Sequence, residues 1–516
     1  MTHIVETTNG KIEGFEKNNV SIFLGIPFAS PPTGKKRWLS PEPVVPWHGV
    51  KETKSFVAMA PQKIAPLNPS SPFQVNPRID LSIGRQPPVN EDCLHLNIYT
   101  PGTDKARRPV MVWIHGGAFA TGTGASPLSN GTVLASRGDV VVVTINYRLN
   151  IFGFLRLNDV TNGLIPSTGN EGILDQLAAL KWVRNNIEAF GGDPNNITIF
   201  GLSAGAASVC ALLGMKAAKG LFNKAISQSG SADFLNDRDE ANGYSEYFLY
   251  LLGVKGSDVS ALQELKMERL LETYVRAMSL PKGIRSPTVT IDGEIFKEMP
   301  ILSIKAGSGD GIPLLAGTAA DEWRTWQATD PAIANLVEGR MIGRFKRMMP
   351  GWDITSLVKE YGSLLSKRGI APTPTEIYLA IMTARMFWIP TTRVLEAQSK
   401  RGNPAYSYMF TWKASFLNGM FGAFHGIDSG FLWNTYNPVV VGTSPMAETL
   451  SHSMQDAWLS FARTGNPGCP ALGKWPTYGE HRETMLLGEQ TRVEQAPLEE
   501  ERLIWKSVPD NIFKWG

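Results

Sequence analysis

The sequence predicts an α/β fold with a central, mostly parallel sheet and helices on both of its faces. Four short apolar runs, typical of buried strands, lie at residues 109–114, 140–147, 197–200 and 225–228. Helical patterns follow the second and the third run, over residues 170–190 and in the small-residue stretch after 203. Strands that alternate with helices pair in parallel and carry helices on both faces of the sheet. The order of these segments therefore predicts one such sheet.

Two long segments interrupt this alternation. Residues 231–311 and 330–399 are predicted to be mainly helical, and each precedes a further strand, at 313–316 and at 405–410. In open parallel sheets the ligand binds at the carboxyl ends of the strands, where such insertions stand. We therefore expect a single catalytic domain over residues 1–516, with helical insertions over the active site that form the substrate pocket.

Composition narrows the function classes. Charge is nearly balanced, with 50 Lys+Arg against 47 Asp+Glu, and no basic block marks a nucleic-acid surface. No apolar run approaches the roughly 20 residues that span a bilayer, and the N-terminus lacks the pattern of a signal peptide. Cys93, Cys210 and Cys469 are too widely spaced to form a disulfide framework or a metal site. We expect a cytoplasmic monomer or small homo-oligomer with no nucleic-acid partner, no membrane span and no metal.

The pentapeptide Gly201-Leu202-Ser203-Ala204-Gly205 lies where a predicted strand meets a predicted helix. A serine on so sharp a turn has a strained backbone, and glycines on both sides leave it the necessary room. The alternative is a serine in an ordinary glycine-rich turn, and the strand–turn–helix context disfavours it. Ser203 is therefore the predicted nucleophile.

A serine hydroxyl needs a neighbouring base, and the base needs an acid to orient it. Among the seven histidines, only His425 lies in a loop after a late strand, in the chain order serine, acid, histidine that accompanies this motif. The acid is expected in the loop that follows the strand at 313–316. Asp321 and Glu322 are adjacent there, and composition alone does not choose between them.

Acyl transfer also requires N–H groups that stabilise the oxyanion of the intermediate. One is expected from Ala204, directly after the nucleophile. The others are expected from Gly117 and Ala118, in the turn after the strand at 109–114, where little side chain blocks a substrate. The alternative for His115-Gly116-Gly117 is a plain tight turn.

These residues belong to a pattern that resembles the type-B carboxylesterases, a family of α/β-hydrolase fold that includes bacterial p-nitrobenzyl esterases and the cholinesterases. The resemblance implies a triad of Ser203, Glu322 and His425 and an oxyanion hole of Gly117, Ala118 and Ala204. It also implies buried structural ion pairs of Arg148 with Asp175 and of Arg37 with Glu91 or Asp92. The motifs that carry it are residues 25–29 (Gly-Ile-Pro-Phe-Ala), 91–97 (Glu-Asp-Cys-Leu-His-Leu-Asn), 113–119 (Trp-Ile-His-Gly-Gly-Ala-Phe), 190–205, 228–230 (Gln-Ser-Gly), 321–322, 425–426 and 464–467 (Thr-Gly-Asn-Pro).

The chain departs from the family pattern near the nucleophile. Leu202 replaces the usual glutamate, so the pocket should be less anionic and poorer at holding cationic substrates. Trp323 replaces the glycine that often follows the catalytic glutamate, with Trp326 nearby, and the two indoles could narrow the pocket, stack on an aromatic group or simply pack. Ala60 occupies the position of the disulfide partner that Cys93 would need, in keeping with a reducing compartment. The pocket residues that we expect are Leu202, Phe119, Trp323, Trp326 and Phe424.

The function that follows is a serine carboxylic-ester hydrolase that acts through an acyl-enzyme intermediate, without a cofactor, on small to medium, uncharged or aromatic esters. Amide or carbamate hydrolysis is the nearer alternative, because the same groups serve any acyl transfer. The more remote alternative is that the protein is a non-catalytic member of the family that serves in binding or adhesion.

Overall fold

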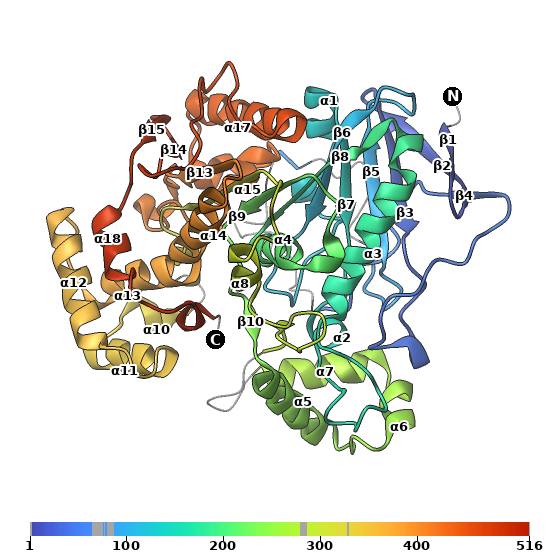
Figure 1. The fold of residues 1–516 in the computed structure, drawn as a ribbon, viewed down its shortest axis with the longest axis horizontal. Coiled ribbons are helices and arrows are strands. Elements are labelled where there is room, and N and C mark those ends of the chain that lie inside the picture. The colour runs from blue at the N-terminus through green and yellow to red at the C-terminus, as the bar shows by residue number, and fades with distance from the viewer. Residues whose placement is uncertain are drawn as a thin grey trace.

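A long twisted sheet runs through the centre of the protein (Figure 1). The computed structural model describes residues 3–63, 76, 78–79, 87–278, 286–327 and 330–514. Within these residues the strands follow the order β1-β2-β3-β5-β7-β6-β8-β9-β12-β13-β14-β15, with β4 beside β2. The strands are β1 His3–Thr7, β2 Gly10–Lys17, β3 Val20–Pro27, β4 Val50–Glu52, β5 His95–Thr100, β6 Arg108–Ile114, β7 Val141–Ile145, β8 Gly192–Leu202, β9 Lys224–Gln228, β12 Leu314–Ala319, β13 Ala405–Phe410, β14 Thr484–Leu487 and β15 Arg492–Glu494.

The centre of the sheet is parallel and its ends are antiparallel. Every neighbouring pair from β7 through β14 is parallel. The pairs β1–β2, β2–β3, β3–β5, β5–β7 and β14–β15 are antiparallel, whereas β4 lies parallel to β2. The predicted α/β-hydrolase fold, with a mostly parallel sheet at its centre, is confirmed.

The two faces of the sheet are buried by different helices. Along β6, Val110, Val112 and Ile114 point into one core and Met111 and Trp113 into the other, because successive side chains of a strand alternate between its faces. The first core is closed by α3 Glu171–Asn186, α4 Ala204–Gly214 and α14 Ile389–Lys400. The second is closed by α1 Thr132–Gly138 and α17 Pro445–Thr464. The sheet is therefore covered on both sides, as predicted.

The two interruptions of the alternation are mainly helical. Sequence reasoning missed a short parallel pair of strands in the first of them, β10 Leu235–Asn236 with β11 Val289–Thr290. Residues 279–285 of the first segment and 328–329 before the second lie outside the described residues. The helices are α5 Arg238–Leu252, α6 Val259–Glu264, α7 Met267–Ala277 and α8 Pro300–Lys305, then α10 Pro331–Ala334, α11 Glu338–Met348, α12 Ile354–Lys367, α13 Pro374–Thr383 and α14. Of these, α5, α6 and α7 of the first segment lie at the bottom of Figure 1, and α11 and α12 of the second lie at its left.

Shorter helices complete the chain. They are α2 Asn150–Gly153, α9 Arg324–Gln327, α15 Ile427–Leu432, α16 Pro438–Val441 and α18 Glu499–Ile504.

Two buried ion pairs join distant parts of the chain. The Arg148 guanidinium donates to both carboxylate oxygens of Asp175, at 2.8 and 2.7 Å, and both side chains are almost fully buried. Arg37 binds Glu91, not Asp92, through two hydrogen bonds of 2.7 Å. Bidentate geometry offsets much of the cost of desolvating such charges.

Replacement of one carboxylate in a buried pair should cost far more than in an exposed pair. Asp175→Asn leaves the Arg148 charge buried and uncompensated, so we expect the free energy of unfolding to fall by about 3–5 kcal/mol. Asp456→Asn is the matched control, because the Asp456–Arg137 pair is 36% and 33% exposed and should contribute at most about 1 kcal/mol. Urea unfolding measures both, and equal losses in the two variants would contradict the assigned role of Asp175.

Candidate active site

Ser203 occupies the sharp turn between β8 and α4. Its φ of 59° and ψ of −124° are strained for a residue with a side chain. The turn is tight enough to require its glycines, since a Cβ on Gly205 would lie 2.0 Å from the carbonyl oxygen of Ile114. A Cβ on Gly230 would likewise lie 2.3 Å from the carbonyl oxygen of Ser203. The packing around the turn therefore holds the serine in its strained conformation.

Glu322 and His425 meet at the carboxyl end of β12. Nδ1 of His425 lies 2.6 Å from Oε2 of Glu322. The other carboxylate oxygen accepts the N–H of Ala319 at 2.8 Å, and the Glu322 side chain is fully buried. A carboxylate held in this way fixes the orientation of the imidazole.

Asp321, the alternative to Glu322 in the sequence, has a different position. Its Oδ2 accepts the N–H of Ala423 at 2.9 Å, and its own N–H donates to the Ala423 carbonyl at 2.9 Å. The N–H of His425 donates to Oγ1 of Thr325 at 3.0 Å. Asp321 thus fastens the histidine loop to the loop after β12 and leaves Glu322 to face the imidazole.

The histidine loop also lies against the end of β8. A Cβ on Gly426 would be 3.4 Å from Cδ2 of Leu202, so the residues that follow His425 and precede Ser203 are neighbours. Within the described ranges no hydrogen bond joins the Ser203 hydroxyl to the imidazole. This bond is often long in enzymes without substrate and tightens when substrate binds.

A turn of unusual backbone conformation faces the serine. Gly117, Ala118 and Phe119 all have positive φ, of 114°, 55° and 57°. A Cβ on Gly116 would lie 3.1 Å from Cβ of Ser203, so this turn packs against the nucleophile. Among the residues that the structure describes, the N–H groups of Gly117, Ala118 and Ala204 donate to no protein acceptor. These three amides are therefore available to an oxyanion.

His115 packs beside the turn of Gly117 and Ala118, and its imidazole is uncharged at neutral pH. Its ring stacks on Tyr147 at 4.5 Å, and the Tyr147 hydroxyl donates to the His115 carbonyl at 2.8 Å. Burial lowers the pKa of His115 to about 4. The imidazole therefore packs as an uncharged ring at neutral pH.

The expected pocket residues occupy different environments. Trp323 and Trp326 stack on each other at 4.4 Å, and Trp326 lies 5.2 Å from the His425 ring. Leu202 and Phe424 are partly buried against the second core. Phe119 is 1% exposed and packs on Phe154 at 4.8 Å, inside the first core.

Phe387 is a neighbour of the histidine that sequence reasoning missed. Its ring lies 4.8 Å from His425 and 5.8 Å from Trp326. It belongs to the π-helical turn Ala384–Trp388, which joins α13 to α14. Pro390 lies two residues after this turn, and a proline inside a helix removes an N–H and disturbs the preceding turn. Pro390 was the signal in the sequence, because it indicates an irregular turn in the helix. Irregular turns of the π type often occur at functional sites.

A buried polar network lies beneath the site. The Asp428 carboxylate accepts from the Tyr408 hydroxyl at 2.9 Å and from the Gln228 side chain at 3.1 Å. Burial raises the pKa of Asp428, and the nearby Glu322 carboxylate adds to the rise. The Gln228 carbonyl accepts the N–H of Ser203 at 2.9 Å. Gln228 thus connects the turn of the serine to the helix that follows His425.

In the described part of the chain, histidine, cysteine, aspartate and glutamate side chains form no cluster of three or more that could hold a metal ion. None of the helices that the structure describes combines the length and apolar character needed to cross a bilayer.

Comparison with known proteins gives a consistent answer. A model of the carboxylesterase family matches residues 1–505. The para-nitrobenzyl esterase of Bacillus subtilis is 37% identical over 97% of this chain and 98% of its own length. The liver carboxylesterase of Sus scrofa is 31% identical over 98% of this chain and 93% of its own. A solved carboxylesterase of Geobacillus stearothermophilus superposes with a TM-score of 0.85, at 38% identity, over 98% of this chain and 100% of that one.

His115 should make the protein less stable in acid. Because burial lowers its pKa from 6.5 to about 4, the unfolded chain binds the proton first as the pH falls through this interval. The free energy of unfolding should therefore fall by about 1.4 kcal/mol per pH unit from this group, between about pH 6.5 and 4. NMR should show one imidazole that stays neutral to about pH 4 and whose signal disappears in His115→Gln. Titration of that signal near pH 6.5 would overturn the assignment.

Proposed function

The chain belongs to the carboxylesterase family and hydrolyses carboxylic esters, and on this premise we propose that Ser203, His425 and Glu322 carry the reaction. The contact of 2.6 Å between Glu322 and His425 is the main support. Nδ1–H of His425 donates to Glu322, which leaves Nε2 free to take a proton.

In the proposed first half-reaction Ser203 attacks the ester carbonyl. Its proton passes to Nε2 of His425, and the imidazolium is stabilised by the buried Glu322 carboxylate. The oxyanion forms next to the three amides of Gly117, Ala118 and Ala204, which need no reorganisation to receive it. His425 then returns the proton to the leaving alcohol, and an acyl ester on Ser203 remains.

Water completes the cycle. His425 takes a proton from a water molecule that attacks the acyl-enzyme, and the same three amides hold the second oxyanion. Collapse of this intermediate releases the acid and restores the Ser203 hydroxyl. No step requires a metal or an organic cofactor.

We infer that both helical insertions shape the substrate pocket of a single catalytic domain. Phe387 comes from the second insertion and lies against His425. Phe234 comes from the first and packs on Phe387 at 6.2 Å. Together with Trp323 and Trp326 these rings make an apolar, uncharged wall beside the base. This wall supports uncharged or aromatic esters of small to medium size as substrates.

Amide or carbamate hydrolysis uses the same groups and remains a second activity to test against matched substrates. A p-nitroanilide and the p-nitrophenyl ester of the same acid differ only in the atom that leaves, so their ratio measures the preference.

A reducing compartment, such as the cytoplasm, is our proposal for where the enzyme acts. Cys93, Cys210 and Cys469 are buried free thiols, and thiols of this kind are typical of proteins kept under reducing conditions.

Substitutions of Glu322 and Asp321 should show which of the two carboxylates is the catalytic acid. Ser203→Ala should lower kcat on p-nitrophenyl butyrate by about 10⁶-fold, and Glu322→Gln by about 10⁴-fold, because an amide cannot stabilise the imidazolium. Asp321→Asn should stay within about tenfold of the wild type, because the amide oxygen can still accept from Ala423. Greater loss in Asp321→Asn than in Glu322→Gln would assign the acid to Asp321.

Leu202 should disfavour cationic substrates. Leu202→Glu places a carboxylate beside the nucleophile, so the rate on butyrylcholine relative to its neutral isostere 3,3-dimethylbutyl butyrate should rise about fivefold or more. Leu202→Gln, which has the same shape without the charge, is the control and should leave the ratio unchanged. An equal rise in both variants would show that polarity or shape, not charge, sets the preference.

A further inference from the structure

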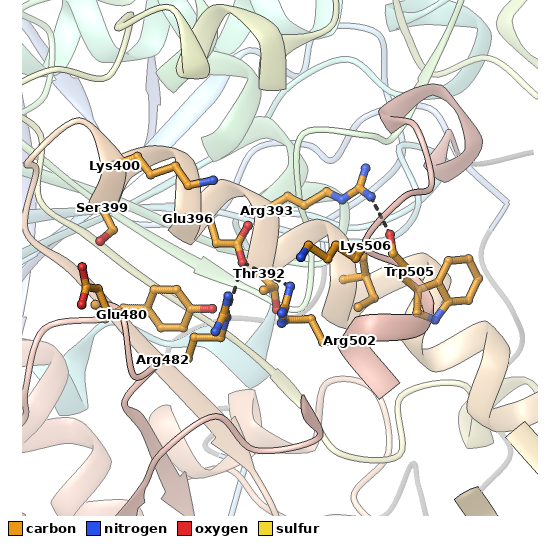
Figure 2. Close-up of a pocket in the computed structure, with 13 residues that line it drawn as sticks. Thr392, Arg393, Glu396, Ser399, Lys400, Glu480, Arg482, Arg502, Trp505 and Lys506 are labelled. Atoms are coloured by element: carbon orange, nitrogen blue, oxygen red, sulfur yellow. Dashed lines mark hydrogen bonds and ion pairs between the residues drawn. The ribbon is translucent and has the colours of Figure 1, made fainter. Parts of the chain in front are cut away.

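A cavity lined by charged side chains lies apart from Ser203, between α14, the loop before β14 and the end of α18. Its volume is about 710 Å³. None of the residues of the proposed triad lines it. Figure 2 shows the side chains that surround it: Ile389, Thr392, Arg393, Glu396, Ser399, Lys400, Tyr478, Gly479, Glu480, Arg482, Arg502, Trp505 and Lys506. We call it the Lys400–Lys506 cavity.

Three of its five cations are engaged with carboxylates of the protein. Arg393 donates to Asp510 at 2.6 Å, and Arg502 makes two hydrogen bonds of 2.8 and 2.7 Å to Glu499. Arg482 has only distant carboxylates, Glu396 at 3.5 Å and Glu499 at 3.7 Å. Its Nε is buried and, among the described residues, donates no hydrogen bond. An N–H donor of a charged group is thus left unsatisfied at the cavity wall.

Lys400 and Lys506 are both exposed and form no ion pair with the residues that the structure describes. Lys400 ends α14 and Lys506 follows α18, so they approach the cavity from different elements. Within the described ranges neither ammonium group has a carboxylate within 4.0 Å. In Figure 2 both point toward the middle of the cavity, around Glu396, whereas Glu480 lies at one end. Arg482 and Arg502 lie 3.5 and 3.8 Å from the Glu396 carboxylate, and the two lysines line the same cavity.

We propose that the Lys400–Lys506 cavity binds a small organic dianion, with a phosphate monoester as the favoured class. The planar guanidinium of Arg482 and two ammonium groups from different elements match an oxyanion that carries two charges. The volume lies within the range of small-molecule sites. Tyr478 and Ile389 supply apolar wall for the organic part of the ligand. The site is independent of the proposed triad, so Ser203→Ala should bind the dianion as the wild type does.

The test uses inorganic phosphate as the probe, in isothermal titration calorimetry at low and constant ionic strength. We expect saturable binding of one phosphate per chain. The double variant Lys400→Gln, Lys506→Gln should bind at least tenfold more weakly. Lys255→Gln with Lys359→Gln is the matched control, since both of these lysines are exposed and lie outside the cavity, and it should bind normally. Melting temperatures without phosphate verify that each variant is folded.

A second variant should act in the opposite direction. Glu396→Gln removes the central negative charge, so phosphate should bind more tightly than in the wild type. Succinate in place of phosphate distinguishes the two sources of a dianion: tighter binding with the same dependence on the two lysines would assign the site to dicarboxylates. No saturable binding of either dianion, or equal affinity in the two double variants, would overturn the proposal.

Discussion

The strained backbone of Ser203 is the constraint on which the rest of the site depends. A residue with a side chain at φ 59° and ψ −124° costs about 1–3 kcal/mol and persists only where its surroundings determine it. Here β8, α4 and Gly230 enclose the turn so closely that no Cβ fits at the glycines. The same turn makes Ala204 the first residue of α4, with an N–H that donates to no acceptor among the described residues. The proposed nucleophile and one proposed oxyanion donor thus depend on the same local conformation.

The partners of the serine depend on contacts between loops that are far apart in the chain. The parallel pairing of β12 with β13 brings the ends of both strands to one edge of the sheet. Asp321 then ties the loop of Glu322 to that of His425, and the π-turn places Phe387 on the imidazole. Because an insertion supplies this ring, the proposed pocket wall can vary without change to the sheet that positions the proposed triad. Leu202, Trp323 and Trp326 are where this chain departs from the family pattern.

The sequence predicted the strands of the sheet and the turn of Ser203 better than it predicted the side-chain contacts around His425. Strand positions followed from apolar runs bounded by turns, and Ser203 from its glycines, since both signals are local. The choice between Asp321 and Glu322 was not local, because adjacent residues point in different directions after a strand ends. Phe387 was missed because its proximity to His425 depends on how an insertion folds back. The Arg482 and Lys506 side chains likewise line the same cavity as Lys400 only through tertiary packing, which no local pattern in the sequence indicates.

The central claim is that Ser203 in its strained turn is the nucleophile, and covalent trapping tests it most directly. A fluorophosphonate that reacts with activated serines is added in substoichiometric steps, and ester hydrolysis and intact mass are followed together. We expect one adduct per chain, loss of activity in proportion to the adduct, and its location on the peptide that contains Ser203. Complete loss of activity with the adduct on another residue, or full labelling of Ser203 with activity retained, would contradict it.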